Sequence, residues 1–291
     1  QDHKPVRQQD AVVGHAVRAM YLFCAVADLV ARTGDKDLER AMDLVWEDAV
    51  NRKMYITAGV GPSAHNEGFT VPYDLPNDTA YAETCAAIGF ALWGQRLLAL
   101  KGDASYGDIV ERALYNGALS GISLSGDRFF YVNPLESHGN HERTPWFSCA
   151  CCPPNILRVL ASIGGHFYGE SEDALWVNLY GQSRASAQVG NTPVTVRQAT
   201  RYPWEGDVTL TLEPGAPTTF SLRLRKPGWC ETLTCAVNGE PLEAEAGEDG
   251  YVDIRRLWSP GDRVTLSLSM PVRKMVAHPA VEATRGRVAL T

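Results

Sequence analysis

Ser-Cys-Ala-Cys-Cys-Pro-Pro-Asn, at residues 148–155, places three of the chain's seven cysteines within four positions. The stretch joins a loop to an apolar run with helical periodicity. A Pro-Pro pair suits the first turn of a helix, where a missing N–H costs nothing. Cysteine is often a small buried residue, but dense thiols at such a junction also oxidise, react and bind metal ions. We interpret the cluster as a metal or nucleophile site rather than as packing.

Composition limits the classes of function. A chain of 291 residues, with 45% hydrophobic and 21% charged residues, is long enough for two globular domains. The net charge of −7 argues against a nucleic-acid partner, because no basic stripe could neutralise phosphates. No membrane span is expected either, since the most apolar run (residues 11–31) contains Arg18 and Asp28.

The cysteine count and the two ends of the sequence suggest where such a protein works. Seven cysteines, an odd number without disulfide-type spacing, favour a reduced compartment, and we therefore expect a cytoplasmic protein. The sequence starts at Gln1 rather than Met and stops within a strand-like run. We interpret it as a piece of a longer protein whose native N-terminus is missing.

The first half of the chain has helical periodicity. Apolar residues predict one helix from Val12 to Gly34 and a second, capped by Asp35, that runs to about Lys53. Further helices are expected at residues 79–100, 106–119 and 155–167, with a strand-like aromatic run at 129–132. A loop rich in glycine, at residues 58–68, separates the second helix from the third.

A faint internal repeat indicates how these helices are arranged. Val-Ala-Arg-Thr-Gly-Asp (30–35) and Leu-Ala-Leu-Lys-Gly-Asp (98–103) each join two amphipathic helices, and a long loop follows each hairpin. Repeated helical hairpins with long loops on one side are typical of a toroid of paired helices, with a site built from the loops.

The second half has the pattern of a β-sandwich. Alternating or β-branched runs at 174–180, 194–196, 207–212, 219–224, 251–254 and 263–268 are separated by turns rich in Gly, Pro, Asn and Asp. The sequence thus predicts an α+β multidomain protein with a helical domain at residues 1–170. A β-sandwich domain should follow at 171–291, apparently cut at its C-terminus.

Residues able to carry chemistry gather in the helical half. Glu83 and Cys85, together with Cys151 and Cys152, offer one carboxylate and three thiolates, a plausible tetrahedral set for Zn²⁺. Positions i and i+2 diverge on a regular helix, so this set requires a distorted helix start at Glu83. Glu67, in the glycine-rich loop, has no packing reason to be charged.

Simpler interpretations exist for each of these residues. Glu67 could be a solvated loop residue, and a glutamate in the first turn of a helix often only complements the helix dipole. Cys149 and Cys152 have the spacing of a redox pair, although no βαβ pattern surrounds them.

Three separated motifs resemble those of the β-L-arabinofuranosidase family, glycoside hydrolase family 127. They are His-Ala-Val-Arg-Ala-Met-Tyr (15–21), Tyr-Ala-Glu-Thr-Cys-Ala-Ala-Ile-Gly (81–89) and Cys-Ala-Cys-Cys-Pro-Pro-Asn-Ile (149–156). The resemblance extends over the β half, including Leu-Arg-Leu-Arg-Lys-Pro-Gly-Trp at 222–229. It implies a partial (α/α)₆ barrel followed by a β-sandwich, in agreement with the pattern above.

The same resemblance implies roles for individual residues. Cys151 matches the family's nucleophile and Glu67 its general acid/base. Zinc ligands correspond to Glu83, Cys85, Cys151 and Cys152. His15 matches a sugar-contacting histidine, and Tyr131 is expected to contact the sugar as well.

The implied activity is a retaining exo-glycosidase that releases terminal β-L-arabinofuranose from an arabinose-containing oligosaccharide or glycoconjugate. Two alternatives stay open: a related glycosidase for another rare pectin sugar, or a non-catalytic, zinc-stabilised carbohydrate-binding fragment. Family members are about twice as long, and half a barrel should leave apolar helix faces that need covering. A homodimer is one assembly that would cover them.

Overall fold

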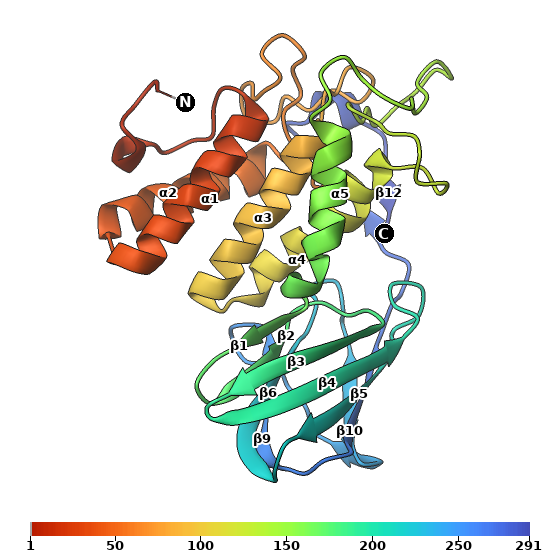
Figure 1. The fold of residues 1–291 in the computed structure, drawn as a ribbon. Coiled ribbons are helices and arrows are strands. Elements are labelled where there is room, and N and C mark those ends of the chain that lie inside the picture. Colours follow the sequence, from red (N-terminus) through yellow and green to blue (C-terminus); the bar gives the residue numbers. More distant parts are fainter. Residues whose placement is uncertain (1) are drawn as a thin grey trace. The chain divides into compact units, whose positions relative to one another are not determined.

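The computed structural model describes residues 2–291, which form two compact units (Figure 1). The helical unit comprises residues through Leu100 together with Ile109–Leu160 and Val272–Thr291; the strand unit comprises Lys101–Asp108 and Ala161–Pro271. A helical part followed by a β-sheet part confirms the predicted α+β class. The sequence predicted a single boundary between domains at 1–170 and 171–291, whereas segments of the two units alternate along the chain.

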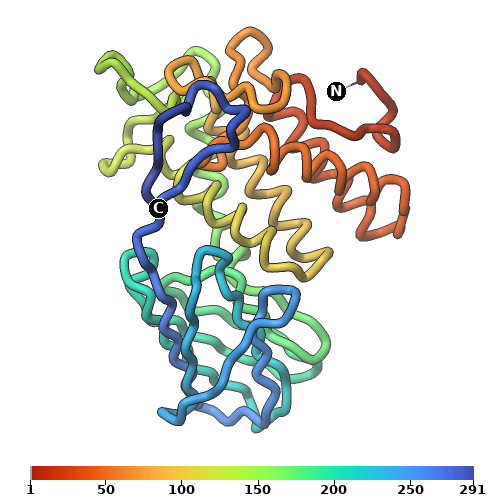
Figure 2. Tube along the Cα trace, turned by 180° about the vertical axis from the view of Figure 1, so that it is seen from behind, coloured from red at the N-terminus to blue at the C-terminus, as the bar shows by residue number. Residues whose placement is uncertain are grey.

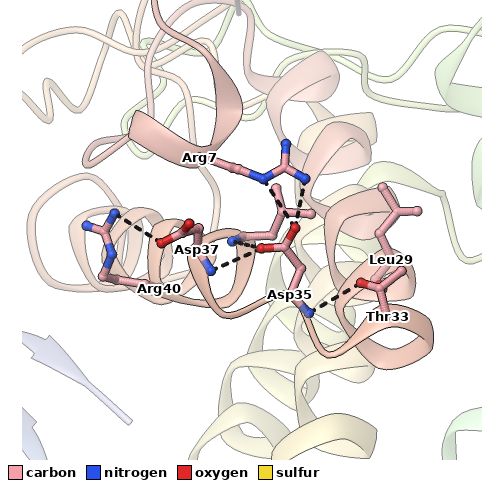
Figure 3. A network of polar contacts seen from close by, with 7 residues as sticks. Arg7, Leu29, Thr33, Asp35, Asp37 and Arg40 are labelled. Atoms are coloured by element: carbon pink, nitrogen blue, oxygen red, sulfur yellow. Dashed lines mark hydrogen bonds and ion pairs between the residues drawn. The ribbon is translucent and has the colours of Figure 1, made fainter.

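Helices α1 (Ala16–Thr33) and α2 (Lys36–Arg52) form a hairpin with a well-capped turn. The Asp35 carboxylate accepts hydrogen bonds from the backbone N–H groups of Asp37 and Leu38 at the start of α2 (Figure 3). Arg7 reaches the other Asp35 oxygen at 2.7 Å, which ties the segment before α1 to this turn. The cap predicted at Asp35 is therefore confirmed.

Two helices begin later than the sequence predicts. Helix α1 begins at Ala16 rather than at Val12, because His15 and Gly68 form an antiparallel bridge that keeps the chain extended. Helix α3 (Thr84–Lys101) begins five residues after Thr79. Tyr81 and Ala82 donate their N–H groups to the carbonyls of Pro62 and Gly61, and Ala82 has a positive φ of 38°, so this segment cannot be helical.

Helix α3 is the centre of the helical unit. Apolar residues surround it on nearly all sides, as expected of a helix enclosed by others. Its Trp93 contacts Phe23 of α1, and its Phe90 and Trp93 contact Trp46 of α2, with ring centroids 4.8–5.0 Å apart. Gly89 permits the close approach of α1, because a Cβ there would lie 2.8 Å from Met20 Cβ.

The later helices also depart from the prediction in detail. Helix α4 (Ala104–Arg112) continues as a π-helical turn (Ala113–Ala118) and a 3₁₀ turn (Leu119–Gly121). The strand-like run at 129–132 forms isolated bridges of Phe129 to Ile122 and Thr144 and is otherwise part of a loop. Helix α5 (Cys152–Ser162) begins three residues before Asn155 and passes into a 3₁₀ turn (Ile163–His166).

The strand unit contains two antiparallel-rich sheets that stack as a sandwich (Figure 1). One sheet has the order β1-β2-β6-β9 and the other β3-β4-β5-β10-β7-β8. Alternate residues of β5 and β10 are buried, as expected where one face of a sheet covers a core. The bounds are β1 Tyr168–Glu170, β2 Ala174–Val177, β3 Ser183–Val189, β4 Thr192–Thr200, β5 Asp207–Pro214, β6 Thr218–Arg225, β7 Leu233–Val237, β8 Glu240–Leu242, β9 Tyr251–Trp258 and β10 Asp262–Leu268.

After β10 the chain returns to the helical unit through residues 272–291, here called the return segment (Figure 2). Strands β11 (Lys274–Met275) and β12 (Ala289–Leu290) pair within it. His278 stacks on Tyr73 at 4.4 Å between ring centroids, and the Ala283 carbonyl accepts a hydrogen bond from Asn77. Arg287 pairs with Glu136 at 2.7 Å. The segment therefore fastens two loops of the helical unit.

Within residues 2–291, none of the helices combines the length and apolarity that crossing a membrane requires.

A buried ion pair holds the chain just before α1. The Lys53 ammonium lies 2.9 Å from Asp48 Oδ2, and the two side chains are only 6% and 4% exposed. The pair also binds both backbone groups of Val12: Asp48 accepts from its N–H and Lys53 donates to its carbonyl. The charged side chains of Asp48, on α2, and Lys53, at the C-terminal end of α2, thus hold the backbone that leads to His15.

Replacing Lys53 by Met should lower the free energy of unfolding by about 3–5 kcal/mol, because the buried Asp48 charge would lose its main partner. Urea denaturation followed by circular dichroism measures this loss. Lys36→Met is the matched control, since the Lys36–Glu39 pair is largely exposed at the lysine and should contribute about 1 kcal/mol or less. Equal losses of unfolding free energy in the two variants would contradict a stabilising role of the buried Lys53–Asp48 pair.

Candidate active site

Three helix beginnings bring the predicted site residues together. His15 precedes α1, Glu83 precedes α3, and Cys152 is the first residue of α5. One potential ligand atom each from Glu83, Cys85, Cys151 and Cys152 lies within 4.8 Å of the other three. Glu83 precedes the first residue of α3, so its side chain can turn toward Cys85. This is the irregular helix start that the ligand set requires.

Hydrogen-bond distances describe the cluster in more detail. Glu83 Oε1 lies 3.4 Å from Cys151 Sγ and 3.6 Å from Cys152 Sγ, and the two sulfur atoms are 3.7 Å apart. Glu83 Oε2 is buried and has no hydrogen-bond partner among the described residues. An unpartnered carboxylate oxygen beside three thiols is suited to a cation, because burying a charge without a partner is costly.

The electrostatics lead to the same conclusion. Burial raises the pKa of the Cys151 thiol to about 12. Burial also raises the pKa of Glu83, and the nearby Glu67 charge adds to this effect. Hydrogen bonding to Cys85 raises the pKa of Cys152, and the same bond lowers the pKa of Cys85. Three of the four acidic groups therefore resist ionisation by themselves, whereas a divalent cation would reverse that preference. The Glu83–Cys85–Cys151–Cys152 cluster can hold a metal ion.

Glu67 lies beside this cluster, not away from it. One atom each of His15, Glu67 and Glu83 falls within 4.8 Å of the others. His15 Nε2 lies 2.9 Å from Glu67 Oε2, and the Tyr81 hydroxyl donates a hydrogen bond to Glu67 Oε1 at 2.9 Å. Both carboxylate oxygens are thus held, while the side chain is still 40% exposed.

The backbone around Glu67 explains how a loop residue is held in place. Its carbonyl accepts the N–H of Ala16, and the next residues pair with the chain before α1. Gly68 makes this contact possible, because a Cβ there would lie 2.0 Å from the Gly14 carbonyl oxygen. Glu67 itself has a φ of 49°, a left-handed conformation that a non-glycine residue adopts only at some cost.

Tyr131 lies over the thiols. Its hydroxyl is 3.1 Å from Cys151 Sγ and 3.8 Å from the exposed Cys149 Sγ. The segment that carries it is bound to the start of α3: Thr84 donates its N–H to the Tyr131 carbonyl and its hydroxyl to the Phe130 carbonyl. Asn133 adds hydrogen bonds to Ala82 O and Thr84 Oγ1.

The structure therefore brings together all seven residues predicted for the site, listed here as His15, Glu67, Glu83, Cys85, Tyr131, Cys151 and Cys152. The sequence reasoning missed two supporting residues, Tyr81 and Asn133. Tyr81 lies within a quoted motif, two residues before Glu83, so its position was a usable signal. Nothing in the sequence pointed to Asn133.

Comparisons with known proteins identify the family of this chain. Residues 1–165 match the model of the "Beta-L-arabinofuranosidase, GH127 catalytic domain", and residues 174–270 match the GH127 middle domain. A non-reducing end β-L-arabinofuranosidase of Bifidobacterium longum subsp. longum is 38% identical over 304 residues, which cover 99% of this chain and 46% of that protein.

Solved structures give the same family. A GH127 β-L-arabinofuranosidase from Geobacillus stearothermophilus T6 is 48% identical, with a TM-score of 0.96 over 100% of this chain and 48% of its own. A second GH127 β-arabinofuranosidase is 43% identical, also with a TM-score of 0.96, and 48% of it is covered. The chain spans about half the length of these relatives. It belongs to the β-L-arabinofuranosidase family, glycoside hydrolase family 127.

Proposed function

We propose that the protein carries the catalytic centre of a retaining exo-glycosidase that releases terminal β-L-arabinofuranose from oligosaccharides or glycoconjugates. One observation carries the proposal: a carboxylate held on both oxygens, Glu67, adjoins a buried cluster of thiols that contains Cys151. The identity of the proposed sugar comes from relatives that are named β-L-arabinofuranosidases. Because the chain spans about half their length, their activity is carried over as part of the proposal.

The metal proposed for the cluster is zinc, held by Glu83, Cys85, Cys151 and Cys152. Three sulfur donors and one carboxylate are a donor set typical of Zn²⁺, whereas Mg²⁺ and Ca²⁺ prefer oxygen ligands. When bound there, zinc would deprotonate the coordinated thiols and so keep Cys151 as a thiolate at neutral pH.

The first step uses Cys151 and Glu67. The Cys151 sulfur attacks the anomeric carbon, the glycosidic C–O bond breaks, and the Glu67 carboxylic acid gives its proton to the departing oxygen. In the second step the Glu67 carboxylate removes a proton from water. The water oxygen then attacks the anomeric carbon and the C–S bond breaks. Two inversions give net retention of configuration.

The neighbours of Glu67 suit its two successive roles as general acid and general base. Because His15 and Tyr81 each hold one oxygen, the carboxyl group keeps its orientation while it changes protonation state. The hydroxyl of Tyr131 is beside the attacking sulfur, where a sugar hydroxyl would also have to lie. His15 and Tyr131 are accordingly our proposed sugar contacts.

The main alternative, a binding module with structural zinc, explains less of this arrangement. A structural metal site needs its four ligands but has no need of Glu67, nor of the strained backbone that places Glu67 there. The position of Glu67 next to Glu83 therefore favours hydrolysis over binding alone.

Cys151→Ser should reduce turnover of an aryl β-L-arabinofuranoside by at least about 10³-fold, since an alcohol at this position is a far poorer nucleophile than a thiolate. Steady-state release of the aryl group measures the loss. Cys149→Ser is the control, because this exposed neighbour has no proposed role. Full turnover by Cys151→Ser would rule out the thiolate mechanism.

Glu67→Gln should lower turnover by about 10²–10⁴-fold, the usual contribution of general acid–base catalysis. Added azide should restore release of a good leaving group and give an arabinofuranosyl azide of retained configuration, because azide needs no general base. Glu47→Gln, a surface change on α2, should behave like the wild type. If azide has no effect, Glu67 is not the acid/base.

Removing the metal should abolish activity and adding zinc should restore it. Elemental analysis of the purified protein is expected to find about one zinc per chain, as a four-ligand site holds one ion. Dialysis against a strong chelator under reducing conditions, followed by zinc addition, tests reversibility. A metal-free protein with reduced thiols and full activity would contradict the proposal.

A further inference from the structure

A cleft of about 500 Å³ adjoins the candidate active site beside Glu67. Its lining includes Ala64, three residues before Glu67, and Tyr81, whose hydroxyl donates a hydrogen bond to Glu67 Oε1 at 2.9 Å. Val132, the residue after Tyr131, lines the cleft as well. Ligand pockets of proteins usually have volumes of about 300–1,000 Å³, so the cleft is large enough for a small molecule.

The proposed reaction requires a binding site in such a place. In a retaining mechanism the nucleophile attacks one side of the anomeric carbon, and the leaving group departs from the opposite side. Because Glu67 gives its proton to the departing oxygen, the group attached to that oxygen has to lie beside Glu67 and away from Cys151. The cleft meets both conditions, since it shares Tyr81 with Glu67 and its described lining residues include no thiol.

The walls of the cleft are fixed by backbone contacts of the protein itself. One wall is the loop before α3, and the other is the loop at residues 132–141. Asn133 donates its N–H to the Tyr81 carbonyl at 3.1 Å, and Leu135 donates its N–H to the Asn77 carbonyl at 2.8 Å. The two walls are therefore joined at two points, and the cleft is formed without a ligand.

His141 offers a fixed polar group within the second wall. Its ring stacks on Phe130, with centroids 4.5 Å apart, and Arg143 lies over the same Phe130 ring at 4.4 Å. His141 Nε2 lies 3.0 Å from the Val132 carbonyl oxygen. A carbonyl can only accept a hydrogen bond, so Nε2 carries the hydrogen and the neutral ring keeps Nδ1 as an acceptor. Such an acceptor is suited to a hydroxyl group.

The charges of the cleft favour an uncharged ligand. Two carboxylates line it, Asp78 and Glu136. Arg287 neutralises Glu136 at 2.7 Å, whereas Asp78 is exposed and has no ion-pair partner among the described residues. An unpaired carboxylate accepts hydrogen bonds from hydroxyl groups and repels an anion.

We propose that this cleft is the leaving-group subsite and that it binds an uncharged sugar residue, the one from which arabinofuranose is released. The inference rests on the glycosidase proposed above and adds the chemistry of the group that Glu67 protonates. Asp78 and His141 accept hydrogen bonds from hydroxyl groups of that sugar. The Asp78 carboxylate also selects against a uronic acid in the same position.

Asp78→Ala tests the subsite with two substrates. An arabinofuranosyl-arabinose disaccharide with a β-L linkage fills the cleft, whereas methyl β-L-arabinofuranoside does not extend into it. The ratio of kcat/KM for the disaccharide to kcat/KM for the methyl glycoside should fall about tenfold or more, the usual effect of losing a hydrogen bond to a charged group. His141→Phe keeps an aromatic ring beside Phe130 and should lower the same ratio. Asp37→Ala, a surface change on α2, is the control and should keep the wild-type ratio.

A third substrate, in which a uronic acid is the leaving group, tests the selection by charge. Asp78→Lys should raise kcat/KM for this substrate relative to the neutral disaccharide by about three- to tenfold, since a repulsive exposed pair becomes an attractive one. The gain should shrink at high salt. Asp37→Lys changes the net charge equally and should leave the preference as in the wild type. An unchanged preference in Asp78→Lys would contradict the selection by Asp78.

The outcomes separate the two proposals, once thermal unfolding has shown that each variant is folded. A wild type that hydrolyses neither the disaccharide nor the methyl glycoside would overturn the proposed function and this inference with it. A wild type that hydrolyses both, while Asp78→Ala and His141→Phe keep its ratio of kcat/KM values, would overturn the leaving-group subsite alone.

Discussion

Three helices have to begin at one place for this site to exist. The first turn of a helix carries unpaired N–H groups and a partial positive charge, which favours anionic groups nearby. Here the residues at those beginnings are Glu83, Cys152 and, opposite Glu67, His15. The same property of the backbone therefore helps to hold the Glu83 carboxyl group, the thiols and the Glu67 carboxyl group in one small volume. Packing of α3 between aromatic residues of α1 and α2 keeps these ends in register.

The helices and most strands could be predicted from apolar spacing, but their beginnings could not. Predicted starts at residues 12, 79 and 155 became 16, 84 and 152. In the first two cases a hydrogen bond to a distant loop determines where the helix begins. These bonds run from the Ala16 N–H to Glu67 O and from the Ala82 N–H to Gly61 O. Periodicity reports what a helix buries along its length and contains no information about such long-range partners.

The candidate ligands were predictable because carboxylates and thiols have few other reasons to gather, and because three motifs resembled one family. Their supporting residues were harder to find. Tyr81 and Asn133 are neutral groups whose importance comes from what they touch, Glu67 and Thr84 respectively. Hydroxyl and amide side chains are frequent in every loop and helix end, so composition alone does not distinguish a supporting partner from a surface residue.

The return segment has a consequence for how the protein folds. Since residues 272–291 belong to the helical unit, the strand unit is an insertion within it. The return segment can dock only if the chain between closes a loop, and the entropy lost in that closure grows with the length of flexible chain. A folded insertion brings its two ends to fixed positions, whereas an unfolded one leaves more than a hundred residues to be ordered. Docking of His278 and Arg287 on the helical unit is thereby coupled to folding of the β-sandwich through chain connectivity alone.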